Sequence, residues 1–132
     1  MPDYLLDVNV VVAHAILEHE HHQAVATWLT GKSRVGCTFH VSPIIELGLI
    51  RNAMRIGGIS ISEARQLLEN EYVNLRLRRI PDSIGADQLP DWVQGYRQTT
   101  DAYLCELAKA HQMDFVTIDK GIPGATPILS KQ

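Results

Sequence analysis

The chain has few of the residues that hold small proteins together from outside a hydrophobic core. Among its 132 residues there are two cysteines, Cys37 and Cys105, too few for a zinc cluster or a disulfide framework. Aromatic residues make up only 6%, so no extended base-stacking platform is expected. Hydrophobic residues make up 45% and charged residues 20%, which is typical of soluble globular proteins. We therefore expect a single domain over residues 1–132.

Long apolar runs are also missing. Stretches without charged side chains, such as residues 35–45, are much shorter than the roughly 18–20 apolar residues that span a membrane. The first seven residues contain no basic region and no long apolar run before their acids, so no secretory signal is expected. These features predict a cytoplasmic protein without a membrane partner.

The chain has fewer basic residues than acidic ones. Twelve basic and fifteen acidic residues give a net charge of −3 and a pI near 6.0. This balance argues against binding to nucleic acid through a broad basic surface. It does not exclude a metal-dependent nuclease, because such a site concentrates carboxylates and takes its positive charge from the ion. The placement of individual acids has to decide between these classes.

Short apolar segments alternate with helical ones along the chain. The expected strands are 4–6, 35–41, 73–77, 115–118 and a weaker one at 126–129. The expected helices are 10–17, 23–30, 43–56, 63–71 and 101–111. Ser42 with Pro43, and Ser62, are typical helix starts. The alternation predicts an α/β layered fold with a mainly parallel sheet.

Four acids lie where ordinary structural roles explain them poorly. Asp7 and Asp119 each follow a short apolar strand directly, and ligands bind at the carboxyl ends of strands in parallel sheets. Asp101 and Glu46 each begin the apolar stripe of a helix, where a charge is costly unless something positive meets it. The helix from Asp101 advances about 15 Å and the following strand returns roughly 16 Å. Asp101, Asp119 and Asp7 are therefore expected at one end of the molecule.

Carboxylates that lie within a few ångströms of one another repel unless they are protonated or neutralised. A hard divalent cation with oxygen ligands is the simplest solution, and Mg²⁺ typically takes one or two carboxylates directly, with waters completing its octahedron. Thr117 lies two residues before Asp119 and faces the same side of its strand, where it could orient a water.

Four short blocks carry these acids in order along the chain. They are 5–10 (LLDVNV), 42–47 (SPIIEL), 100–104 (TDAYL) followed by Leu107 and Ala108, and 117–121 (TIDKG). In this order and spacing the blocks resemble the acidic motifs of PIN domains, and most closely those of the VapC-type toxin ribonucleases. The resemblance covers essentially the whole chain and implies a three-layer α/β/α sandwich.

The same resemblance implies a function and a set of site residues. It implies a Mg²⁺- or Mn²⁺-dependent endoribonuclease that cleaves RNA, is inhibited by a cognate antitoxin protein and forms a homodimer. Matched by position, Asp7 and Asp101 are the principal metal ligands, and Glu46 and Asp119 are the other catalytic acids. The supporting polar positions are those of Asn9 and Thr117.

Two other functions stay open on the sequence. A phosphatase with Asp7 as its nucleophile usually has a second Asp two residues later, where this chain has Asn9. A non-catalytic PIN-fold module that binds RNA or protein would need none of the four acids, yet all four are present.

Two polar stretches have ordinary structural explanations. The histidine-rich segment 14–22 does not match the HExxH metalloprotease pattern, because position 23 is Gln. A solvated connection between helices explains it better than a zinc site. Arg76, Arg78 and Arg79 could contact RNA phosphates, but the wet face of an edge strand is an equally good explanation.

Overall fold

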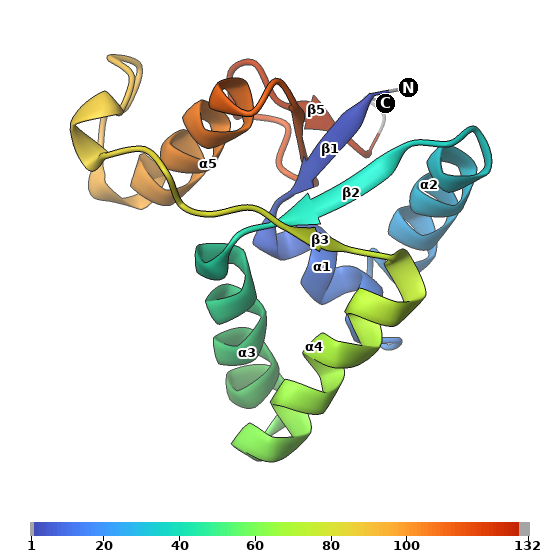
Figure 1. Ribbon diagram of the computed structural model, residues 1–132. Coiled ribbons are helices and arrows are strands. Elements are labelled where there is room, and N and C mark those ends of the chain that lie inside the picture. The colour runs from blue at the N-terminus through green and yellow to red at the C-terminus, as the bar shows by residue number, and fades with distance from the viewer. Residues whose placement is uncertain (1, 130–132) are drawn as a thin grey trace.

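The computed structural model describes residues 2–129, and in these residues five parallel strands form one sheet (Figure 1). The strands are β1 (Asp3–Leu6), β2 (Thr38–Val41), β3 (Arg78–Arg79), β4 (Asp114–Thr117) and β5 (Thr126–Pro127). Their order across the sheet is β3-β2-β1-β4-β5. The central strand β1 pairs Leu5 with His40 of β2 on one side and with Phe115 of β4 on the other. All carboxyl ends therefore point the same way.

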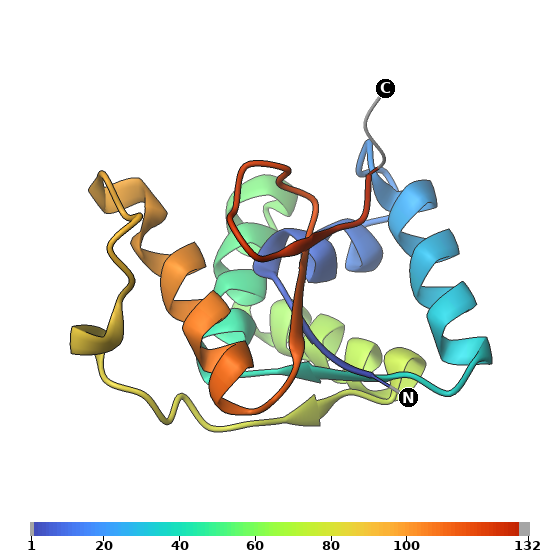
Figure 2. The same cartoon turned by 90° about the horizontal axis from the view of Figure 1, so that it is seen from above.

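Helices connect the strands and cover both faces of the sheet. They are α1 (Val8–Ala15), α2 (His22–Arg34), α3 (Pro43–Gly57), α4 (Ile61–Leu75) and α5 (Thr99–Ala110), with short 3₁₀ turns η1 (Ala86–Gln88) and η2 (Tyr96–Gln98). α1 contacts α2, α3 and α4, whereas α5 packs against β4 and the two 3₁₀ turns, on the other side of the sheet (Figure 2). This is the predicted α/β/α sandwich with a parallel sheet. Within the described part of the chain, no helix combines the length and apolar character needed to span a bilayer.

The core explains why the strands are apolar without alternation. Leu5 and Leu6 of β1 are both fully buried, although successive side chains of a strand point to opposite faces. Val10 of α1 and Leu104 of α5 are fully buried as well, in the same core cluster. A parallel sheet covered on both faces needs apolar residues at consecutive positions.

The predicted strand at 73–77 is wrong. Residues up to Leu75 belong to the last turns of α4, and β3 is confined to Arg78–Arg79. The alternation of Val73, Leu75 and Leu77 imitates a strand, but Val73 is 76% exposed on the helix. A period of two over five residues is too short to separate a strand from the end of a helix.

The start of α4 also differs from the prediction. The helix begins at Ile61 because Ser60, rather than Ser62, is its N-cap. The Oγ atom of Ser60 accepts a hydrogen bond from the Glu63 backbone N (3.1 Å), and Glu63 Oε1 accepts one from the Ser60 backbone N (2.9 Å). This reciprocal pair is a capping box.

Three further boundaries differ from the prediction. α2 runs through Gly31 to Arg34, because one glycine in a helix costs only about 1 kcal/mol relative to alanine. As a result the strand predicted at 35–41 begins only at Thr38. α1 begins at Val8, two residues earlier than expected, directly after Asp7.

Candidate active site

Three of the four acids lie around the carboxyl ends of the neighbouring strands β1 and β4. Asp7 follows β1, and its backbone N donates to Val116 O of β4 (2.8 Å). It is also the N-cap of α1, where its Oδ1 accepts from the Val8 backbone N (2.7 Å). Asp119 follows β4 after one intervening residue, and Asp101 lies in the first turn of α5. The path of the chain therefore returns to Asp7 twice, as predicted from the helix and strand lengths.

A buried hydroxyl fixes this arrangement. Thr117 is fully buried, and its Oγ1 donates to Asp7 Oδ2 (2.7 Å). The same oxygen accepts from Asn9 Nδ2 (3.2 Å) and from the Asp119 backbone N (3.1 Å). A hydroxyl has one proton and two lone pairs, so these three bonds use its whole capacity. Its proton goes to Asp7 rather than to a water.

Asn9 completes the link between the two strand ends. Its Oδ1 accepts from the Ile118 backbone N (3.2 Å), while its Nδ2 donates to Thr117. The first turn of α1 is thereby tied to the residues that follow β4. The two supporting positions thus hold Asp7 and Asp119 in a fixed relation.

The electrostatics of this group are unfavourable without a cation. Asp7 is 4% exposed, and burial raises its pKa from 3.8 to about 7. The hydrogen bonds from Thr117 and Val8 oppose this rise, whereas the negative charges of Asp101 and Asp119 add to it. The pKa of Asp101 is also raised, first by burial and then by Asp119. Three carboxylates therefore lie close enough to repel one another.

Asp7 and Asp101 line the same pocket, which has a volume of about 280 Å³. The remaining lining residues come from α1, from α3 and from the loop after α1: Val8, Asn9, Val12, His19, Asn52 and Ile56. None of the lining residues is a lysine or an arginine. The pocket therefore carries negative charge that its own walls do not balance.

The wall formed by α1 and α3 depends on a glycine. A Cβ atom built on Gly48 of α3 would lie 2.6 Å from Cγ2 of Val8 and 2.9 Å from its Cγ1. Real Cβ atoms essentially never make contacts that short, so any larger residue at position 48 would force Val8 or the two helices to shift beside Asp7.

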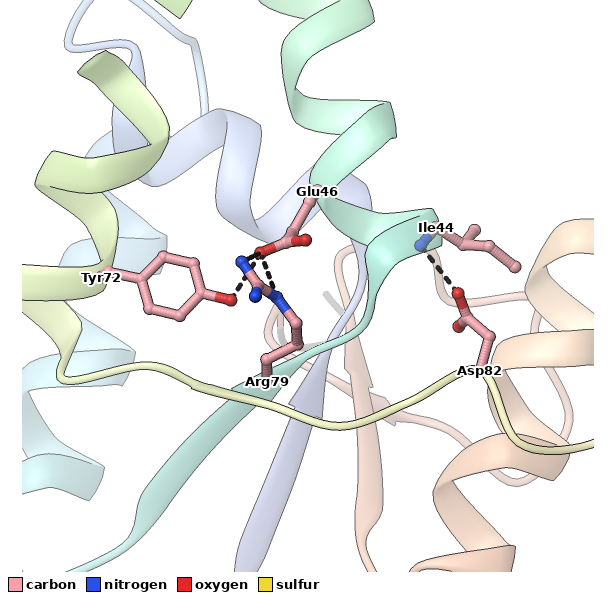
Figure 3. Close-up of polar contacts among 5 residues, drawn as sticks. All are labelled: Ile44, Glu46, Tyr72, Arg79 and Asp82. Atoms are coloured by element: carbon pink, nitrogen blue, oxygen red, sulfur yellow. Dashed lines mark hydrogen bonds and ion pairs between the residues drawn. The ribbon is translucent and has the colours of Figure 1, made fainter. Parts of the chain in front are cut away.

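Glu46, the fourth acid, has its contacts elsewhere (Figure 3). Its side chain is 12% exposed, and its Oε2 accepts hydrogen bonds from Tyr72 Oη (2.5 Å), Arg79 Nε (3.0 Å) and Arg79 Nη2 (2.8 Å). Burial and the Glu46 carboxylate raise the pKa of Tyr72 to about 12, and the hydrogen bond to Glu46 raises the pKa of Arg79. Glu46 begins the apolar stripe of α3, where a charge needs a positive partner, and that partner is Arg79. The structure brings Asp7, Asp101 and Asp119 together, while Glu46 is engaged by Tyr72 and Arg79.

The start of α3 also relies on a distant residue. Ser42 is the N-cap and Pro43 the first helical residue, as predicted, but Ser42 Oγ is buried and makes no hydrogen bond within the described residues. Asp82 Oδ2, from the segment after β3, accepts from the Ile44 backbone N instead (3.1 Å; Figure 3). Sequence reasoning missed Asp82 and the partners of Glu46. The core-facing position of Glu46 was the one signal that a cation had to lie nearby.

The donor set can be tested against a divalent cation. Within residues 2–129, no three His, Cys, Asp or Glu side chains form a ready-made metal-binding group. Two carboxylates in one pocket still match the one or two direct ligands that Mg²⁺ commonly takes, with waters completing the shell. Their raised pKa values show that this pair is short of positive charge. The residues present therefore fit a hard divalent ion.

Comparison with known proteins identifies the family. The family model of the PIN domain matches residues 4–125. The chain belongs to the PIN domain family. Among similar proteins, ribonuclease VapC29 of Mycobacterium tuberculosis is 37% identical over 119 residues, which cover 89% of this chain and 86% of the relative. Ribonuclease VapC38 of the same organism is 34% identical over 128 residues, with the same coverage.

A solved structure agrees with the PIN fold. The structure described as VapBC2 from Rickettsia felis bound to a DNA fragment from their promoter matches with a TM-score of 0.68. At 18% identity, the match covers 95% of this chain and 96% of that chain, and it supports the fold alone. Together with the family model and the VapC relatives, this confirms the predicted resemblance of the chain to VapC-type PIN domains.

Proposed function

We propose that this PIN domain is a divalent-metal-dependent endoribonuclease, the toxin of a toxin–antitoxin pair, which hydrolyses RNA phosphodiester bonds. The observation that carries the proposal is the cluster of Asp7, Asp101 and Asp119, in which the buried Asp7 and the half-buried Asp101 have raised pKa values and the negative charges repel one another. The names of the Mycobacterium tuberculosis relatives, all called ribonucleases, support the reaction class.

In this proposal Asp7 and Asp101 hold Mg²⁺ or Mn²⁺ in the pocket that they share. When bound, such an ion lowers the pKa of a water and offsets charge on the phosphoryl group. Thr117 orients the Asp7 carboxylate through a charge-assisted hydrogen bond of 2.7 Å. Asn9 keeps that hydroxyl in place by donating to it. The pair therefore acts on the ligand Asp7 in the way that hydrogen-bond partners orient metal ligands generally.

Asp119 and Glu46 are proposed to hold waters at the edge of the site. Asp119 is exposed, and its Oδ1 accepts from the Gly121 backbone N (2.8 Å), which fixes the carboxylate after β4. Glu46 receives all of its protein donors on Oε2, and Figure 3 shows its other oxygen turned away from them. That second oxygen is available to accept from a water.

A cognate antitoxin, a homodimer and a cytoplasmic location belong to the same proposal. They are supported by the resemblance to VapC-type toxins and, for the antitoxin, by the shared fold with the solved VapBC2 structure. A chain that slowed neither growth nor translation when expressed alone would argue against the toxin role.

The neighbours of Asp7 disfavour a phosphatase that uses it as a nucleophile. Such an enzyme usually has a second Asp two residues later, and this chain has Asn9 there. The Asn9 side chain is bonded to Thr117 and to the Ile118 backbone N, and an amide cannot act as a general acid. Covalent phosphoryl labelling of Asp7 would contradict this argument.

The test is cleavage of a panel of structured RNAs in Mg²⁺, in Mn²⁺ and in EDTA. We expect cleavage in either metal and none in EDTA. Asp7→Asn and Asp101→Asn should each reduce the rate by about 10³-fold, because a lost ligand removes several kcal/mol of charge stabilisation. Asp114→Asn is the matched control, since Asp114 is an exposed acid at the opposite end of β4.

Circular dichroism must show that each variant is folded. If folded Asp7→Asn and Asp101→Asn chains cut RNA as well as the parent, the metal-ligand assignment fails. RNA binding by the parent without cleavage in any divalent metal would instead indicate a non-catalytic binding module.

A further inference from the structure

One wall of the acidic pocket is formed by a histidine that the proposed mechanism does not use. His19 lies in the connection between α1 and α2 and lines the pocket together with Asp7 and Asp101. Its side chain is half-buried. The sequence suggested only a solvated connection at this point, so its position in the pocket needs a separate explanation.

The local backbone determines which ring nitrogen of His19 carries the proton. The backbone N of His21 donates a hydrogen bond to His19 Nδ1 (3.0 Å). A backbone N–H can only donate, so Nδ1 must accept, and the proton of the neutral ring lies on Nε2. Within the described residues, Nε2 has no protein partner. The loop therefore assigns the donor role to Nε2.

The two asparagines of the pocket are each held by a hydrogen bond that uses one of their two amide N–H donors. Asn9 Nδ2 donates to Thr117 Oγ1, and Asn52 Nδ2 donates to Gly48 O (2.8 Å). Asn52 Oδ1 accepts from Arg55 Nη2 (2.8 Å). The remaining lining residues are two carboxylates and three aliphatic side chains.

A phosphate that enters this pocket can meet the proposed ion on one side, but the described residues that line the walls include no lysine or arginine to bind its other oxygens. We propose that His19 Nε2–H donates a hydrogen bond to a non-bridging phosphate oxygen of the RNA strand and so positions the backbone in the pocket. This rests on the proposed function only in taking RNA as the substrate. His19 is then a substrate-contacting residue that acts as a neutral donor and does not transfer its proton.

Binding can be measured separately from cleavage. The probe is a fluorescently labelled single-stranded RNA, and the protein is the Asp7→Asn chain in EDTA, so that neither metal nor turnover contributes. Into this chain we would introduce His19→Ala, His19→Gln or His21→Gln. The amide of Gln replaces Nε2–H approximately. His21→Gln is the matched control because it keeps the backbone N that donates to His19 Nδ1 and removes only the His21 ring, whose centroid lies 5.7 Å from that of His19.

We expect His19→Ala to weaken RNA binding by about tenfold to a hundredfold, the range for a hydrogen bond to a charged group. His19→Gln should recover most of this loss, and His21→Gln should bind like the Asp7→Asn chain. A 2′-deoxy strand of the same sequence should show the same dependence on His19, because its phosphates are unchanged. In the parent chain with Mn²⁺, His19→Ala should raise KM more than it lowers kcat.

Several outcomes would overturn the assignment. Equal binding by the His19→Ala and His21→Gln chains would show that His19 makes no contact with the RNA. The absence of any RNA binding by the Asp7→Asn chain would show that the pocket does not hold the RNA backbone. A His19→Gln chain as weak as His19→Ala would exclude the donor role. Loss of the His19 effect on the 2′-deoxy strand would move the contact to the ribose hydroxyl. If RNA binds through His19 but is never cut, only the ribonuclease proposal fails.

Discussion

Glu46 and Asp7 both lie just beyond the carboxyl ends of central strands, yet the chain surrounds them differently. Glu46 receives the Tyr72 hydroxyl and the Arg79 guanidinium on one oxygen, so its charge is balanced within the protein. Asp7 receives two neutral donors, and its charged neighbours are Asp101 and Asp119. One acid thus has its own counterion, and the other lies among like charges.

This difference separates two uses of a carboxylate. A balanced acid adds to the connection between α3 and β3 and is compatible with a stable fold. An acid left among like charges costs stability whenever it is ionised, and that cost is removed only by a proton or a cation. Sites that bind ligands are often less stable than the rest of the protein for this reason.

The largest expected effect on stability is that of Asp7→Asn. The pKa of Asp7 is about 7 in the folded chain against 3.8 for an exposed carboxyl. The folded state therefore holds the proton of Asp7 more tightly than the unfolded state does. The resulting contribution to the free energy of unfolding is fully present below pH 3.8 and is lost as the pH rises to about 7. Without metal at pH 8, Asp7→Asn should raise the free energy of unfolding by up to about 4 kcal/mol.

Urea unfolding of both chains in EDTA from pH 4 to pH 8 measures this effect. The difference in the free energy of unfolding between variant and parent should be small at pH 4 and should grow as the pH rises to 8. A difference that stayed constant, or that shrank as the pH rose, would show that Asp7 is not an unbalanced acid.

Added Mn²⁺ should remove the difference in stability between the two chains at pH 8. An ion that binds only the folded parent stabilises it by about 4.1 kcal/mol at one thousand times its dissociation constant. Asp7→Asn removes one proposed ligand, so its melting temperature should hardly respond. Differential scanning fluorimetry with increasing Mn²⁺ tests this. Equal shifts in both chains would place the ion elsewhere.

Thr117→Val should have a smaller effect on the same site. The substitution keeps the shape of the side chain but removes the proton donated to Asp7 and the acceptor used by Asn9 and by the Asp119 backbone. Since partners that orient a metal ligand commonly contribute 10–100-fold, Mn²⁺ affinity should fall by roughly that factor. Calorimetric titration on a folded variant measures it. Unchanged affinity would mean that the hydroxyl serves packing alone.

The smallest effect is expected on the balanced acid. Arg79→Ala removes the cation from Glu46, and because the Arg79 side chain is 58% exposed we expect a loss of about 1 kcal/mol in the free energy of unfolding. Cleavage should fall by less than about tenfold, since the other three acids are untouched. Arg78→Ala is the control, because Arg78 is the exposed neighbour on β3. A loss of cleavage as large as that for Asp7→Asn would remove the distinction between the two environments.

The sequence predicted those features that depend on neighbours along the chain. The apolar runs before Asp7 and Asp119 identified β1 and β4, and the lengths of α5 and β4 placed Asp101 near both acids. The parallel arrangement then followed from the alternation of strands and helices. At Val73–Leu77 the alternation of apolar and polar residues was too short to identify the secondary structure, and the end of a helix looked like a strand.

Contacts between distant residues were beyond this reasoning. Arg79 meets Glu46 across 33 positions, and Asp82 meets Ile44 across 38. Nothing in the order of residues gives the path of β3, which carries Arg79, or of the segment after it, which carries Asp82. His19 was likewise visible only as part of a histidine-rich run, because its place in the pocket depends on how α1 packs against α3.

The glycine at position 48 decides more than the packing of two helices. Because Val8 occupies the space where any other side chain would begin, α1 and α3 interlock immediately beside Asp7. A side chain at position 48 would therefore force Val8, which lines the pocket together with Asp7, to shift. A substitution that touches none of the acids would in this way reshape the wall beside them.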